Sequence, residues 1–192
     1  MKWQTAIACS ALGLGMIFSS SAPLQAAQAA DKAAELVAAE LSSSYSEQQK
    51  IIRKNAHIHS PSGLAAYISK NNASDSPLNS LSPAARKRFI DSLQFNDGGV
   101  TSFYYADIES QLTSSQAYEL LSLFGLQGTL QFMPKLRINT ASDREIIRAF
   151  GGGSSTQSST PGIPLPEDHQ DYWCSGRATC SRNIGSICTG NC

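Results

Sequence analysis

The sequence has no cysteine between Cys9 and Cys174, and four of its five cysteines lie in the last 19 residues. It also lacks net charge, because 15 basic and 15 acidic residues cancel, so nothing in its charge favours nucleic-acid binding. No stretch reaches the ~20 consecutive apolar residues that a membrane-spanning helix needs, so we expect no transmembrane segment in the mature chain. The informative segments are therefore the two ends.

Sequence patterns of enzymes are also missing. No serine lies in a G-x-S-x-G motif, and a catalytic cysteine would need a partner histidine that the C-terminal region lacks. His57 and His59 form an H-x-H pair without an evident third metal ligand, which favours a solvated loop. We therefore predict no enzymatic activity, no bound metal and no cofactor.

The N-terminus has the layout of a secretory signal peptide. Lys2 precedes an apolar run from Ala6 to Phe18, and small residues lead to an A-x-A pattern at Ala27–Ala29. We predict a signal peptide over residues 1–29, removal of Cys9 with it, and a secreted or periplasmic mature chain. Removal of Lys2 leaves 14 basic and 15 acidic residues in that mature chain.

The remaining cysteines, Cys174, Cys180, Cys188 and Cys192, are spaced C-x5-C-x7-C-x3-C. An even number in an exported chain predicts disulfides, because the exterior is oxidising. Three pairings are possible, and the sequence does not choose among them. Paired CxxC motifs and a nearby histidine, which would indicate zinc, are absent.

Residues 30–150 have a helical pattern. Ser82 with Pro83, and Thr113 with Gln116, predict two helix starts. Further helices are expected from residue 31, after Ser46 and after Ser142. Apolar spacing from Val100 to Leu112 favours another helix, although its β-branched and aromatic start would suit a strand. Residues 129–138 are expected to form an extended connector or an edge strand, because Pro134 would break an interior strand. The predicted fold class is therefore all-α, a small helical bundle.

The composition changes after Phe150. Residues 151–171 are rich in glycine, serine, threonine and proline, which predicts a flexible linker. Residues 172–192 are too few to fold by hydrophobic burial alone, so we expect a disulfide-rich C-terminal mini-module, tethered to the bundle. Its candidate effector surface comprises Tyr172, Trp173, Arg177 and Arg182, aromatic and cationic groups suited to an anionic surface or membrane interface.

The segments LSPAARKRFIDSL and LTSSQAYELLSLFG, followed by a separate Cys-rich C-terminus, resemble the bacteriocin fulvocin C-related proteins. The resemblance covers roughly Leu81 to Phe132 and the layout of the tail. It implies a precursor in which the N-terminal region accompanies an antibacterial tail. The tails of that family are usually richer in cysteine, so this tail differs from theirs in its number of cysteines.

Two functional hypotheses follow. In the first, the chain is an exported precursor, a processing protease cuts the linker, and the released disulfide-bonded peptide acts on a bacterial envelope or receptor. In the second, the chain is an exported helical binding protein whose Cys-rich tail is a structural clip or anchor. The first hypothesis requires the tail to leave the folded domain, whereas the second requires it to stay.

Overall fold

The computed structural model describes residues 22–70, 76–150 and 168–192. Most of the predicted signal peptide and residues 151–167 of the predicted linker lie outside the described residues. The helices are α1 Ala22–Lys54, α2 Pro61–Lys70, α3 Pro83–Ser92, α4 Ala106–Gln111, α5 Ser114–Ser122 and α6 Ala141–Phe150, with 3-10 turns η1 Pro77–Ser80 and η2 Gln127–Phe132. The strands are β1 Gln94–Asn96, β2 Gly99–Tyr104, β3 His169–Gly176 and β4 Thr179–Cys188.

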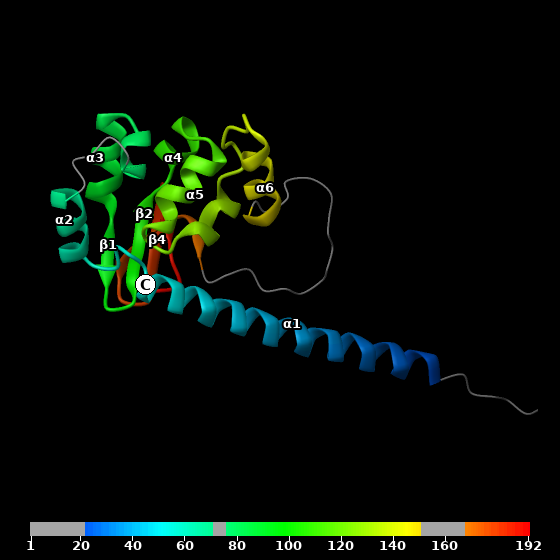
Figure 1. Cartoon of the computed structure of the whole chain (residues 1–192). Helices are drawn as coiled ribbons and strands as arrows, with labels where there is room; N and C mark the ends of the chain where they lie inside the picture. The colour runs from blue at the N-terminus through cyan, green and yellow to red at the C-terminus, as the bar shows by residue number, and fades with distance from the viewer. Residues whose placement is uncertain (1–21, 71–75, 151–167) are drawn as a thin grey trace, which may run out of the picture.

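The four strands form one antiparallel sheet in the order β1-β2-β4-β3. The all-α prediction is therefore wrong, since the fold is mixed α/β with helices packed around a sheet (Figure 1). β4 pairs with β2 through Ser102–Cys188, Phe103–Ile187 and Tyr104–Ser186. The C-terminal hairpin is thus part of the main sheet and not a tethered mini-module.

The β3–β4 hairpin is sharply bent. Cys180 and Cys188 are eight residues apart in β4, yet their Cα atoms are only 6.0 Å apart, where a straight strand would separate them by ~26 Å. The bend lies at Asp171 and Gly185, which have φ of 63° and 84°. The Asp171 carboxylate accepts the Gly185 N–H at 2.9 Å and so fixes the bend. A Cβ at Gly185 would lie 2.7 Å from the Tyr104 ring, so glycine is required there.

The hydrophobic core joins the helices to the sheet. Phe89 of α3 packs edge-on against Phe103 of β2 and against Phe124, with ring centroids 6.1 and 5.5 Å apart. Ile187 of β4 belongs to the same core and is fully buried, as is Cys188. The C-terminal strand therefore supplies side chains to the centre of the domain.

Two of the predicted helix starts are confirmed. Thr113 and Gln116 form the predicted capping box of α5, and the Ser82 side chain caps α3 with Pro83 in the first turn. The last helix begins at Ala141, earlier than the start predicted after Ser142, because Thr140 and Asp143 bond reciprocally and cap it. No helix starts after Ser46, which lies inside the continuous α1.

Two segments differ from their predicted structure. Val100–Tyr104 is strand, and only Ala106–Gln111 of the predicted helix is helical. β2 is buried on both faces, so its apolar residues lack the alternation that marks a half-exposed strand. The connector predicted as extended begins as the 3-10 turn η2.

Helix α1 extends away from the body of the domain, and its C-terminal end lies near the C-terminus of the chain (Figure 1). None of the helices in the described part of the chain is both long and apolar enough to cross a membrane. The contact that matters for the site is made by the last turn of α1, where Arg53 is buried.

Candidate functional site at the disulfide-linked hairpin

The four C-terminal cysteines form two disulfides, Cys174–Cys192 and Cys180–Cys188. The prediction of disulfides in the C-terminal region is confirmed, and the pairing is now assigned. Cys174 and Cys180 face each other across β3 and β4 without being bonded to each other. Each instead crosslinks the tip of the hairpin to the chain beyond its bend, which holds the tip folded back.

A buried ion pair fastens the start of the hairpin to α1. Arg53 Nη2 donates to Asp168 Oδ2 at 2.6 Å, and the two side chains are only 2% and 3% exposed. The other carboxylate oxygen of Asp168 accepts the Gly190 N–H at 2.9 Å. Asp168 therefore ties the last turn of α1 to both ends of the C-terminal segment.

A second anchor lies at Tyr105, between β2 and α4. Its hydroxyl donates to the Asp171 carboxylate at 3.3 Å and accepts from the Gln170 amide at 2.7 Å. Burial raises the pKa of Tyr105, and the Gln170 hydrogen bond only partly opposes this rise. The phenol therefore stays protonated near neutral pH and continues to donate to Asp171.

The last residues of the chain bind the β1–β2 hairpin. Thr189 donates its N–H to the Thr101 carbonyl and its hydroxyl to the Val100 carbonyl, both at 2.8 Å. Asn191 donates its side-chain amide to the Gly98 carbonyl and accepts from Asn96. The C-terminus is thus held against the β1–β2 turn.

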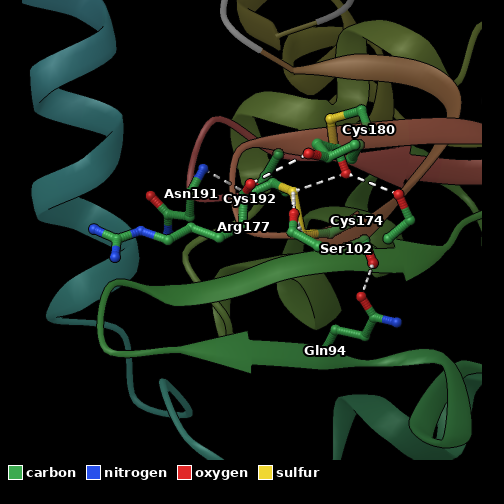
Figure 2. Close-up of a disulfide and its surroundings, with 12 residues drawn as sticks. Gln94, Ser102, Cys174, Arg177, Cys180, Asn191 and Cys192 are labelled. Atoms are coloured by element: carbon green, nitrogen blue, oxygen red, sulfur yellow. Dashed lines mark hydrogen bonds between the residues drawn. A yellow bond between two sulfur atoms is a disulfide. The ribbon is translucent and has the colours of Figure 1, made fainter.

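Between these two hairpins lies a groove with a volume of about 850 Å³, within the usual range for small-ligand sites. One side is the β1–β2 hairpin and the other is the hairpin tip with the Cys174–Cys192 disulfide (Figure 2). Its lining includes Phe95 and Asp97 on the first side and Ser175 and Arg177 on the second.

The groove holds two charged groups of opposite sign. Neither the Asp97 side chain nor the Arg177 side chain forms a hydrogen bond or ion pair within residues 22–70, 76–150 and 168–192, and both residues are exposed. In Figure 2 the guanidinium of Arg177 extends away from the sulfur atoms. Both groups are therefore available to a ligand, whereas Asn96 and Asn191 are occupied by the hairpin contacts.

The four predicted effector residues do not form one surface. Tyr172 faces Arg182 across the strands, whereas Trp173 is the next residue along β3 and points to the opposite face. Trp173 lines a smaller pocket with Phe103 and Ser186. Of the four, only Arg177 lines the groove at the disulfide.

Sequence reasoning missed the other side of the groove. Asn96-Asp97-Gly98-Gly99 contains an Asp-Gly pair, a strong hairpin signal that could have indicated β1 and β2. No hairpin is predicted at these residues from the helical pattern of residues 30–150. Without that hairpin, Asp97 had no structural partner in the tail.

The two histidines of the H-x-H pair have local contacts. The His57 ring packs edge-on against Tyr67 at 5.6 Å, and His59 Nδ1 lies 3.0 Å from the Ala56 carbonyl oxygen. Among the described residues, the metal-type ligand atoms that converge are the sulfurs of Cys180, Cys188 and Cys192, all committed to disulfides.

Comparison of this chain with protein-family models, curated proteins and solved structures finds no match. The function must therefore be inferred from the site itself.

Proposed function

We propose that this chain is an exported binding protein whose C-terminal hairpin is a permanent structural part of the binding site. The observation that carries the proposal is the groove between the two hairpins, with Asp97 and Arg177 unpaired within the described residues on its opposite sides. The predicted signal peptide and the two disulfides are both consistent with an extracytoplasmic location.

The hypothesis of a released peptide fits this fold less well. β4 lies between β2 and β3, and it places Ile187 in the core. Release of residues 172–192 would break the β2–β4 pairing and open the centre of the domain. We therefore favour the hypothesis in which the tail is a structural clip, and the resemblance to bacteriocin precursors stays a prediction.

The chemistry of the groove favours a polar partner with both donors and acceptors. Arg177 offers a planar donor for carboxylate or phosphate groups, and Asp97 offers an acceptor for hydroxyl or amino groups. Phe95, which is partly buried, adds an apolar surface beside them. Polymers of the bacterial envelope carry all of these groups, so we propose an envelope component as the partner.

Binding to isolated bacterial envelopes tests this function. We expect Arg177→Ala to weaken binding of the mature chain about 10-fold or more, because a hydrogen bond to a charged group contributes ~1.5–3 kcal/mol. Arg182→Ala is the matched control, since it removes the same charge from the same hairpin outside the groove. Equal losses for both variants would indicate unspecific electrostatic adsorption and contradict the proposal.

Cleavage of the linker distinguishes the two hypotheses. We expect a chain with an engineered protease site between residues 151 and 167 to keep its tail after cutting, because sheet pairing and the Arg53–Asp168 pair still hold it. Gel filtration under native conditions should show one species, and denaturing electrophoresis should show two fragments. A tail that separates under native conditions and inhibits bacteria would support the peptide-precursor hypothesis instead.

A further inference from the structure

The two disulfides lie against each other. The sulfur atoms of Cys180, Cys188 and Cys192 all lie within 4.8 Å of one another, and Cys174 is bonded to Cys192. A sulfur of one disulfide is thus within a short movement of both sulfurs of the other. Proteins that use disulfides only as crosslinks do not require this arrangement.

The two bonds also differ in access. Cys174 and Cys192 are partly exposed and line the groove, whereas Cys188 is fully buried. A thiolate that enters the groove therefore meets the Cys174–Cys192 bond first.

We propose that the paired disulfides are a thiol-exchange site, at which a small thiolate opens Cys174–Cys192 and the chain rearranges to Cys174–Cys180 and Cys188–Cys192. Because the first bond forms one wall of the groove, the exchange would also regulate the binding proposed above, and that part of the inference rests on the proposed function. The exchange itself depends only on the positions of the four sulfurs.

The reaction has three steps. The entering thiolate attacks the Cys174 sulfur, forms a mixed disulfide there and releases the Cys192 thiolate. The Cys192 thiolate attacks the Cys188 sulfur, which lies within 4.8 Å, and releases the Cys180 thiolate. The Cys180 thiolate attacks Cys174 and expels the small thiolate, so two disulfides are present before and after, and nothing is oxidised or reduced overall.

The last step is favoured by strand register. Cys174 and Cys180 are direct partners across β3 and β4. Directly opposed residues of antiparallel strands have Cα atoms ~4.5–5.5 Å apart, within the ~4.4–6.8 Å range of disulfides. Cys174 and Cys188 are not opposite each other, because Cys188 lies opposite His169 on one side and Ser102 on the other. Of the two alternative pairings, register therefore selects the one proposed.

Rearrangement would change the groove. In the observed pairing, Cys192 is crosslinked to Cys174, and its carbonyl accepts the Ala178 N–H at 2.6 Å. Transfer of Cys192 to Cys188 removes the crosslink between the C-terminus and the hairpin tip. The tip, which carries Arg177, would then be free to move relative to Asp97.

Peptide mapping tests the exchange directly. Trypsin cuts after Arg148, Arg177 and Arg182, which places Cys174 in peptide 149–177, Cys180 in 178–182, and both other cysteines in 183–192. The observed pairing joins all three peptides. The proposed pairing gives 149–177 joined to 178–182, plus an internally bridged 183–192. The third possible pairing again joins all three peptides, so it cannot mimic the expected product.

The oxidised mature chain would be incubated with substoichiometric 2-mercaptoethanol, quenched with N-ethylmaleimide, unfolded and digested. We expect loss of the three-peptide species and an equal gain of bridged 183–192, with 2-mercaptoethanol regenerated. The Cys180→Ser/Cys188→Ser variant is the matched control, since it keeps the accessible bond and removes the second one. It should stop at the mixed disulfide.

Three results would overturn the proposal: no reaction of the folded chain with the thiol, reduction or mixed disulfide without bridged 183–192, or formation of bridged 183–192 only when denaturant is present. Envelope binding is measured separately on the chain before thiol treatment. A chain that exchanges but never binds envelopes refutes the proposed function alone, and a chain that binds but does not exchange refutes only the thiol-exchange site.

Discussion

Deletion of residues 168–192 is expected to abolish cooperative folding of the remaining chain. The deletion removes β3 and the inner strand β4, so β2 keeps only β1 as a partner and becomes an edge strand above an open core. It also removes the fully buried side chains of Ile187 and Cys188. Truncation of one buried aliphatic side chain costs ~2–5 kcal/mol, and a whole domain is stable by only ~5–15 kcal/mol. Loss of the strand therefore costs more stability than the domain can lose and remain folded.

Thermal unfolding followed by circular dichroism and near-ultraviolet signals measures this effect. The matched control is a chain that starts at residue 36, because the part of α1 before it is exposed where its burial is described. This control should unfold with a midpoint close to that of the full chain. A cooperative transition that survives removal of residues 168–192 would show that the helices fold without the tail, as the all-α prediction implied.

Features determined by neighbouring residues were accessible from the sequence. The capping box at Thr113 and Gln116 needs only residues three apart, and the Ser82 cap needs only the Pro83 that follows it. The cysteines near the C-terminus likewise indicated disulfides from their number and context alone. These signals do not depend on the rest of the fold.

The sheet was missed because its pairings are distant in sequence. Phe103 pairs with Ile187, 84 residues later, and nothing near either residue reveals the partner. Val100, Phe103 and Tyr104 also fit a helical stripe, since a strand buried on both faces has no strict alternation. The composition of the tail, rich in glycine and serine, then favoured a separate module over a central strand.

The groove could not be predicted for the same reason. Arg177 is among the predicted effector residues, but its counterpart Asp97 lies 80 residues earlier, in a turn where no hairpin is predicted from the sequence. Arg53 and Asp168 each belong to a short cluster of like charges, where solvation is the ordinary expectation. Only the three-dimensional pairing shows which member of each cluster is buried.

Replacement of Arg53 by methionine is expected to destabilise the domain by about 3–5 kcal/mol, because the Asp168 carboxylate would remain buried without its cation. The midpoint of thermal unfolding should fall by roughly 6–20 °C for a domain of this size. Lys87→Met is the control, because it removes a cation whose ion pair with Asp91 is on the surface, with the two side chains 77% and 58% exposed. Such a pair contributes ~1 kcal/mol or less, so the control should shift the midpoint only slightly.

The double variant Arg53→Met/Asp168→Asn separates buried charge from general damage to packing. Asparagine keeps an oxygen that can accept the Gly190 N–H, while neither buried position then carries a charge. Replacement of a buried ion pair by uncharged groups is often nearly neutral, so much of the lost stability should return. If the double variant is as unstable as Arg53→Met, the loss comes from packing of the Arg53 side chain against the neighbouring backbone, and the ion pair is not what fastens the C-terminal hairpin to α1.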